Sequence, residues 1–252
     1  MRIDRYLAEN GLAVSRAKAQ EILKSGAVTV NGRAVCKPSF EVADGDEIQL
    51  LPTDVTRYVS RGGRKLEAAL DAFSLSPEGL VALDVGASSG GFTDCLLQRG
   101  AAFVYAVDAG SDQLHPTLRA DARVLSMENQ NARVLSPAMF ARIPHFCVMD
   151  VSFISQTLIL PAILSVMTEG GTLISLVKPQ FELGRAALNK SGIVRSEKDA
   201  KRALNEVCAF AKTLGYRLLG TIPSPIRGGD GNLEFLAAFS VPSVEERSKN
   251  NG

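Results

Sequence analysis

The chain has 252 residues, of which 46% are hydrophobic and 22% are charged, with 22 glycines and 11 prolines. These values are close to those of an average soluble globular protein and exclude a disordered, collagen-like or coiled-coil chain. Lysine and arginine number 28 against 27 acidic residues, so the net charge of +1 indicates no partner by itself. The length fits one large domain or two unequal ones.

The four cysteines lie far apart, at positions 36, 95, 147 and 208, and no Cys-x-x-Cys pair exists. This spacing is typical of reduced core residues in a cytoplasmic protein and predicts no metal site. The first residues lack the apolar core of a signal peptide. The most apolar region, 146–167, contains Asp150 and Pro161, so it predicts a strand and a buried helix rather than a membrane span. We therefore expect a soluble, cytoplasmic protein.

The first 50 residues predict two short helices followed by a small sheet. Apolar side chains recur at helical spacing between residues 3 and 7, and Gly11 follows as a stop signal. Ser15 is a favourable N-cap for a second helix. Asn31 and Gly32 supply the positive φ angles that a two-residue hairpin turn needs. The expected bounds are 16–23 for the second helix, 28–35 for the hairpin, and 47–50 for a strand after a turn at 44–46.

Charge is unevenly distributed in this region. Residues 1–40 carry seven basic and three acidic side chains, whereas residues 41–54 carry five acidic and no basic ones. A basic face with an acidic far side would orient itself on a phosphate backbone. An ordinary solvated helix face fits the charges equally well.

The order and spacing of residues favour the first alternative. The segment RIDRYLAENGLAVSRAKAQEILKSGAVTVNGRAV resembles the RNA-binding domain named after ribosomal protein S-four, here called the S-four domain. In that family the helix pair and the following turn sit on structured RNA. The resemblance implies that seven side chains face RNA phosphates, namely Arg2, Arg5, Ser15, Arg16, Lys18, Lys24 and Arg33.

A basic segment follows an interruption of the apolar pattern at 52–56. Residues 55–68 hold four basic side chains against one acidic one, and the pair Gly62 and Gly63 lies inside this run. The pair suggests backbone placed close to a phosphate or a cleft, although a plain connector is the alternative. We add Arg57, Arg61 and Arg64 to the predicted RNA-binding residues. The expected domains are 1–56 for RNA binding, a linker at 57–60, a second domain at 61–243, and a polar tail at 244–252.

From residue 80 onward, apolar strands alternate with helices. The alternation predicts an α/β domain with a doubly wound, mostly parallel sheet and helices on both faces. Such sheets bind ligands at the carboxyl ends of their strands. The expected strands are 80–85, 103–107, 123–127, 146–149 and 172–177, the expected helices are 66–73, 92–97 and 204–214, and a hairpin of 217–222 with 233–241 closes the chain.

Two features of this domain suggest a cofactor. Asp84 lies in the first strand, just before a glycine-rich turn, and Asp108 ends the second, where a carboxylate is well placed to accept from a ribose diol. The turn matches neither the G-x-G-x-x-G dinucleotide pattern nor a phosphate-binding loop. The combination favours a nucleoside-bearing cofactor without a polyphosphate.

The segments LDVGASSGGFTDCLLQRGA and VYAVDAG resemble the S-adenosylmethionine site of RNA ribose methyltransferases related to the heat-shock enzyme FtsJ. With SRGGRKLEAAL, MDVSFIS, LVKPQFE and GNLEFLAAF, nearly the whole chain resembles the TlyA family, also called hemolysin A. The resemblance implies a Rossmann-like domain that methylates the ribose 2′-hydroxyl of cytidine in ribosomal RNA. One departure is Gln130, where the family leads us to expect threonine. The implied cofactor-binding residues are Asp84, Gly86, Ala87, Ser88, Gly90, Gly91, Phe92, Asp108, Glu128 and Asn129.

Four ionisable residues suit this chemistry, because methyl transfer from a sulfonium needs an aligned and activated acceptor oxygen. They match the family's Lys-Asp-Lys-Glu tetrad and are Lys65, Asp150, Lys178 and Glu234. The match implies that Lys178 activates the hydroxyl, as a base or as a cation supporting the alkoxide. Asp150 would steer Lys178, and Glu234 with Lys65 would position that pair and the sugar.

The expected partners are ribosomal RNA or ribosomal subunits, with no DNA and no membrane, and we expect a monomer. Two alternatives remain at this point. One is a non-catalytic RNA-binding or ribosome-assembly factor, which the complete tetrad disfavours. The other is a membrane-active haemolysin, which no hydrophobic segment supports.

Overall fold

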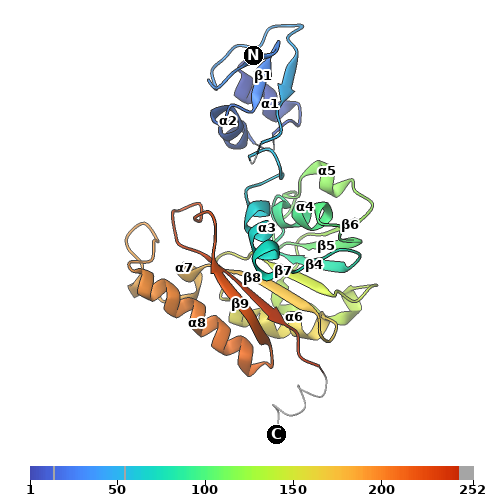
Figure 1. The fold of residues 1–252 in the computed structure, drawn as a ribbon, viewed down its shortest axis with the longest axis vertical. Coiled ribbons are helices and arrows are strands. Elements are labelled where there is room, and N and C mark those ends of the chain that lie inside the picture. Colours follow the sequence, from blue (N-terminus) through green and yellow to red (C-terminus); the bar gives the residue numbers. More distant parts are fainter. Residues whose placement is uncertain (14, 54, 244–252) are drawn as a thin grey trace. The chain divides into compact units, whose positions relative to one another are not determined.

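The computed structural model describes residues 1–13, 15–53 and 55–243 (Figure 1). The chain divides into two compact units, Met1–Gly63 and Arg64 onward. The residues predicted as a linker, 57–60, therefore belong to the first unit. The predicted tail, 244–252, lies outside the described residues.

The first unit contains the two helices and the small sheet that the sequence predicts. Ser15 caps α2 by accepting a hydrogen bond from the backbone N–H of Lys18 at 3.2 Å. Asn31 and Gly32 have φ angles of 50° and 75°, as the predicted hairpin turn requires. The helices are α1 (Ile3–Glu9) and α2 (Arg16–Lys24), and the antiparallel strands, in the order β2-β1-β3, are β1 (Val28–Val30), β2 (Arg33–Ala34) and β3 (Ile48–Leu50).

The second unit is built on a seven-stranded sheet with the order β6-β5-β4-β7-β8-β10-β9. The first five strands in this order are parallel, and β10 is antiparallel to both β8 and β9. The parallel strands are β4 (Val81–Val85), β5 (Phe103–Val107), β6 (Val124–Met127), β7 (Phe146–Met149) and β8 (Thr172–Val177), and the closing hairpin is β9 (Arg217–Pro223) with β10 (Phe235–Ser240). The predicted α/β fold is thus confirmed.

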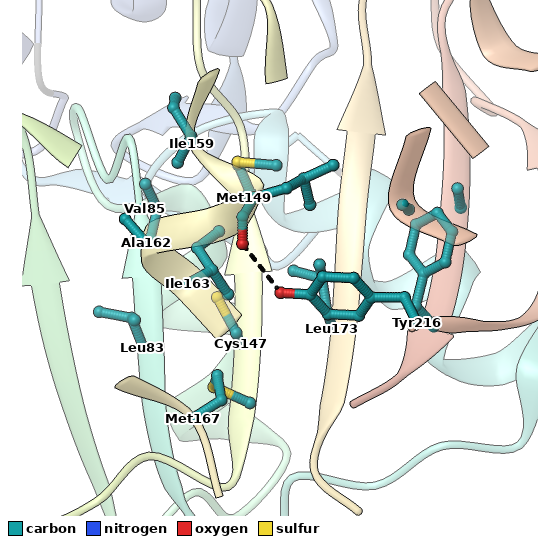
Figure 2. Packing of buried hydrophobic residues seen from close by; sticks show 14 of the residues in the cluster. Leu83, Val85, Cys147, Met149, Ile159, Ala162, Ile163, Met167, Leu173 and Tyr216 are labelled. Atoms are coloured by element: carbon teal, nitrogen blue, oxygen red, sulfur yellow. Dashed lines mark hydrogen bonds between the residues drawn. The ribbon is translucent and has the colours of Figure 1, made fainter. Parts of the chain in front are cut away.

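Helices lie on both faces of this sheet (Figure 1). Alternate residues of β4, β5, β7 and β8 pack with α6 and α8 in one apolar cluster, part of which is shown in Figure 2. Within it, the Tyr216 hydroxyl donates a hydrogen bond to the Leu160 carbonyl at 3.1 Å. On the other face, the ring of Phe73 in α3 lies against Gly220 of β9. The helices are α3 (Gly62–Phe73), α4 (Gly91–Gln98), α5 (Pro116–Arg119), α6 (Leu160–Val166), α7 (Pro179–Glu182) and α8 (Glu197–Thr213).

The main departure from the predicted elements is α8, which begins at Glu197 rather than near residue 204. Ser196 caps it by accepting from the backbone N–H of Asp199 at 3.0 Å. The first two turns are largely charged, so they carry little of the apolar periodicity on which the prediction rested. The helices α5 and α7 were not predicted, because four residues are too few to show a period.

Within the part of the chain that the structure describes, no helix has the length and apolar character needed to cross a bilayer.

Candidate active site

A pocket of about 540 Å³ lies at the carboxyl ends of β4, β5 and β7. The strand order reverses at β4, which has β5 on one side and β7 on the other. In doubly wound sheets the crevice at such a reversal is the usual place for a ligand. The pocket is lined by Gly86, Ser88, Val107, Asp108, Ala109, Gln113, Asn129, Gln130, Asn131, Ala132, Asp150, Val151, Ser152, Phe153, Ile154 and Ile159.

The glycine-rich turn after β4 borders this pocket and packs tightly on its neighbours. Gly86 has a φ of +85°, and a Cβ there would lie 2.4 Å from the backbone oxygen of Asp150. Gly90 has a φ of +93°, and a Cβ there would lie 2.3 Å from a methyl group of Leu118. Both positions therefore require glycine for backbone conformation and for close approach within the protein.

Asp108 organises the loops at the pocket rim. Its carboxylate accepts hydrogen bonds from the backbone N–H of Ser88 and of Gly110, each at 2.7 Å. The backbone N–H of Gln130 in turn donates to the Asp108 carbonyl at 2.9 Å. Asp108 thus fixes the ends of β4 and β5 relative to each other while lining the pocket.

Glu128 does not line the pocket. Its carboxylate accepts from the backbone N–H of Asp112 at 2.9 Å and of Gln113 at 3.2 Å, and it pairs with Arg119 at 2.8 Å. These donors, the Asp112 N–H first among them, hold the pKa of Glu128 below its ordinary value. The contacts show that Glu128 shapes the loop that carries Gln113, which itself lines the pocket.

Asp84 lies fully buried in β4, two residues before Gly86 of the pocket wall. One carboxylate oxygen accepts from the Thr93 hydroxyl at 2.7 Å, and the other has no hydrogen-bond partner among the described residues. Burial raises the pKa of Asp84 to about 7, with the nearby charge of Asp150 adding to the rise. The bond to Thr93 ties β4 to the start of α4.

The four predicted catalytic residues form two ion pairs. Lys178, which follows β8, lies 2.6 Å from Asp150, which follows β7, and it also donates to the Ser152 hydroxyl at 2.9 Å. Lys65 in α3 lies 2.5 Å from Glu234, and both of these side chains are buried. The pair of Lys178 and Asp150 lies at the pocket, because Asp150 and Ser152 are part of its wall.

The sheet register brings the second pair to the same edge. Phe235 of β10 pairs with Val177 of β8 in an antiparallel ladder. Glu234, one residue earlier, therefore lies level with Lys178, one residue later in its own strand. A Cβ at Gly228 would lie 2.5 Å from a carboxylate oxygen of Glu234, so the loop before β10 also closes against this acid.

One aromatic residue at the pocket stands out by its exposure. Phe153 is 91% exposed and has a φ of +63°, a conformation that bulky residues rarely adopt. Its ring lies 4.9 Å from that of Phe181, measured between centroids, and the two planes are tilted by 48°. An exposed, strained aromatic side chain at the rim of a pocket offers a stacking surface to a ligand.

Of the ten predicted cofactor-binding residues, four line the pocket and six do not. Gly86, Ser88, Asp108 and Asn129 line the pocket. The other six are not among the lining residues and comprise Asp84, Ala87, Gly90, Gly91, Phe92 and Glu128. Lining residues that the prediction omitted include Gln113, Val151 and Ile159, whose side chains carry no charge.

The predicted RNA-binding residues of the first unit are mostly exposed. Side chains of Arg2, Arg5, Arg16, Lys24 and Arg33 reach solvent, and that of Lys18 is mostly covered. The pair of glycines has a structural explanation, because a Cβ at Gly63 would lie 2.3 Å from the ring of Tyr58. The Arg57 guanidinium lies over the same ring, 5.5 Å from its centroid. Arg61 is exposed and Arg64 is half-buried.

Across residues 1–13, 15–53 and 55–243, no group of three or more histidine, cysteine, aspartate or glutamate side chains is placed to hold a metal ion.

Comparison with known proteins defines the class to which both units belong. The family model described as FtsJ-like methyltransferase matches residues 58–241. The family model described as S4 domain matches residues 1–48. The larger unit is thus an FtsJ-like methyltransferase domain, and the smaller one is an S-four domain.

Relatives of similar length narrow this class. The 16S/23S rRNA (cytidine-2′-O)-methyltransferase TlyA of Mycobacterium tuberculosis is 39% identical over 93% of this chain and 88% of its own. Hemolysin A of Brachyspira hyodysenteriae is 42% identical over 96% of this chain and all of its own. A solved hemolysin-like protein from Streptococcus thermophilus, 42% identical, superposes with a TM-score of 0.76 over 100% of this chain and 94% of that one. The chain belongs to the TlyA family of FtsJ-like methyltransferases.

Proposed function

We propose that this protein transfers a methyl group from S-adenosylmethionine to the ribose 2′-hydroxyl of a cytidine in ribosomal RNA. The observation that carries the proposal is the contact of Lys178 with two residues of the pocket wall, Asp150 and Ser152. A cofactor pocket and a candidate proton-handling group therefore share one edge of the sheet. The family relationship supports the same reaction, since TlyA of Mycobacterium tuberculosis bears the name of this activity.

The pocket suits S-adenosylmethionine in size and in chemistry. When bound, the cofactor supplies an electrophilic methyl group on its sulfonium sulfur. Asp108 presents a carboxylate on the wall, which suits a ribose diol, and Asn129 adds an exposed amide. Asp84, which has one oxygen without a hydrogen-bond partner among the described residues, lies in β4 just before the same turn.

The tetrad residues divide the remaining work. Lys178 acts on the proton of the 2′-hydroxyl, as a base or as a cation that stabilises the oxyanion. Asp150 and Ser152 hold its ammonium nitrogen in place. The buried pair of Lys65 and Glu234 fixes the adjacent end of β10 and positions the sugar beside Lys178.

Substrate binding is assigned to both units. The S-four domain captures folded ribosomal RNA through its basic side chains, and the predicted basic residues around position 60 extend this contact. A base in a helix has to leave its stack for an enzyme to reach its sugar from a pocket. The exposed ring of Phe153 provides a surface on which such a base can stack.

The decisive experiment measures transfer of labelled methyl from S-adenosylmethionine to purified, unmodified ribosomal subunits. Methylated positions are mapped by their resistance to alkaline cleavage, which needs a free 2′-hydroxyl. We expect Lys178→Ala to lower the rate constant of transfer by about 10²- to 10⁴-fold. Cofactor affinity, measured by calorimetry, should change little because Lys178 itself is not part of the pocket wall.

The matched control is Lys212→Ala, which removes an exposed lysine from the last turn of α8. This variant should transfer methyl at the wild-type rate. Label found on a base instead of a ribose, or transfer that survives in Lys178→Ala, would contradict the proposed reaction. Cofactor binding without transfer to either subunit would assign the enzyme a different RNA.

A further inference from the structure

A single buried carboxylate connects the starts of the two helices in the S-four domain. Asp4, in the first turn of α1, has no exposed surface. Its oxygens accept from Nε and Nη2 of Arg2, both at 3.1 Å, and from Nη2 of Arg16 at 3.0 Å. The Gln20 side chain, one turn further along α2, donates a fourth bond at 3.1 Å. The arginine and amide donors hold the pKa of Asp4 well below its ordinary value.

The arrangement is poorly explained by stability alone. Removing a carboxylate from water is costly, and replacing a buried ion pair with apolar residues is often neutral or stabilising. What the buried charge does provide is geometry, because it fixes two long, flexible side chains on one acceptor. Arg2 lies at the N-cap of α1 and Arg16 is the first residue of α2, so two elements are tied at their first turns.

The two guanidiniums remain open on their far sides. The side chains of Arg2 and Arg16 are 45% and 57% exposed, although both contact a fully buried acid. Arg16 uses only one nitrogen for Asp4, and Arg2 leaves Nη1 out of these bonds. The nearby Glu41 pairs with the amino group of Met1 at 3.1 Å. Outward-facing N–H groups of two guanidiniums held on one carboxylate match the oxygens of a phosphodiester.

We propose that Asp4 is a positioning residue that builds a phosphate-binding clamp from Arg2 and Arg16, and that this clamp holds an RNA backbone phosphate. The inference rests on the proposed function insofar as it assumes an RNA partner. The opposite arrangement is present on the same helix, where Arg5 pairs with Glu9 at 2.6 Å and both side chains are exposed. Such a surface pair fixes little geometry and is screened by salt.

For Asp4→Asn, the clamp predicts a change in RNA affinity opposite in sign to the change expected from net charge alone. Asp4→Asn removes one negative charge, so non-specific attraction would strengthen RNA binding. A lost clamp instead weakens binding to unmodified ribosomal subunits by about tenfold and reduces the magnitude of the log–log salt slope by about one. The control is Glu9→Gln, which removes an exposed negative charge from the same helix and should bind equally well or more tightly. Tighter or unchanged binding by Asp4→Asn overturns the clamp.

A charge-preserving variant guards against misfolding of Asp4→Asn, which hydrogen exchange over residues 1–53 would reveal. Arg16→Lys keeps the charge but loses the planar fork, so the clamp predicts weaker binding. Its control is Arg123→Lys in the second unit, where Asp121 holds the guanidinium by two bonds of 3.1 and 2.7 Å. This control should bind RNA as the wild type does. Unchanged binding by Arg16→Lys would overturn the proposal.

These binding measurements are made without cofactor, so they separate the clamp from the proposed reaction. Weakened binding by both clamp variants, together with no methyl transfer to either subunit by the wild type, leaves the clamp standing and rejects ribosomal RNA as the methyl acceptor. Normal transfer by the wild type, together with unchanged binding by both variants, rejects the clamp alone.

Discussion

Individual carboxylates in this protein behave differently according to what surrounds them. Asp4 and Asp84 are both fully buried. Asp4 meets two guanidiniums and an amide, so its pKa falls, whereas Asp84 meets one hydroxyl and the charge of Asp150, so burial raises its pKa to about 7. Burial penalises the charged form in both cases, and the number of donors decides which effect wins.

The raised pKa of Asp84 predicts a pH dependence of stability. Between about pH 4 and pH 7 the folded protein retains a proton on Asp84 that the unfolded chain has released, so wild-type stability falls as pH rises through this window. Asp84→Asn abolishes this contribution. The free energy of unfolding of the variant relative to wild type should rise by at most about 1.4 kcal/mol per pH unit, and then level off above pH 7. Urea unfolding of both proteins at pH 5, 6, 7 and 8 measures this difference in free energy of unfolding. A difference that does not change with pH would contradict the prediction.

Glu182 offers a second prediction for a single residue. Its carboxylate accepts from the Ser155 hydroxyl at 2.6 Å and from the backbone N–H of Gln156 at 3.0 Å, so it ties the helix after Lys178 to the loop after Asp150. Glu182→Gln replaces one acceptor oxygen with an N–H₂ donor, so the Ser155 hydroxyl has to give up its role as donor to this side chain. We expect the rate constant of methyl transfer to fall about tenfold while the dissociation constant of the cofactor stays within about threefold. A change in cofactor affinity with no change in the rate constant would show that the contacts of Glu182 shape the cofactor pocket and not the position of Lys178.

At the scale of elements, the strands were predictable and the short helices were not. The apolar runs at β5, β7 and β8 match their observed bounds, because strands buried on both faces of a parallel sheet read as continuous apolar segments. The turn after β4 was predicted from its glycines. Sequence could not show that Gly86 faces the carbonyl of Asp150, 64 residues later in the chain, since that contact depends on the pairing of β4 with β7.

The β4 turn provides a prediction with a matched control. Gly86→Ala places a methyl group 2.4 Å from the Asp150 carbonyl oxygen in addition to imposing a strained φ. It should destabilise the fold by about 1–3 kcal/mol and weaken cofactor binding, because Asp150 lines the pocket. Gly170→Ala, at a φ of +68° with nothing within 4 Å, carries only the conformational cost. Equal cofactor affinity in the two variants, measured by calorimetry, would contradict a role for the close contact.

At the scale of the molecule, the two units have separate apolar cores. Ile3, Leu7, Ile22 and Leu23 belong to the first core, and the cluster around β4, β5, β7 and β8 belongs to the second. The tetrad could be proposed from sequence because its members match a family pattern. The same match implies that Asp150 accompanies Lys178 and that Glu234 accompanies Lys65. The sequence could not show that Glu234 lies level with Lys178, because that placement depends on the register of β10 against β8.

Separate cores predict separable functions. Leu23→Ala empties part of the first core and should cost about 2–5 kcal/mol there. Hydrogen exchange should accelerate over residues 1–53 but not over 81–241, and RNA affinity should fall while cofactor affinity is retained. The reciprocal control, Leu173→Ala in β8, should accelerate exchange in the second unit only. Accelerated exchange across both units in either variant would show that they unfold as one.

The order in which the chain is made has a consequence for the Lys65–Glu234 pair, whose members are 169 residues apart. During synthesis, all residues that line the methyl-donor pocket are made well before β10. That strand lies between β8 and β9 in the folded sheet. Until Glu234 has been made, Lys65 lacks this counter-ion, and an unpaired buried charge is strongly destabilising. The buried pair therefore cannot form until residue 234 has been made, after all the residues that line the pocket.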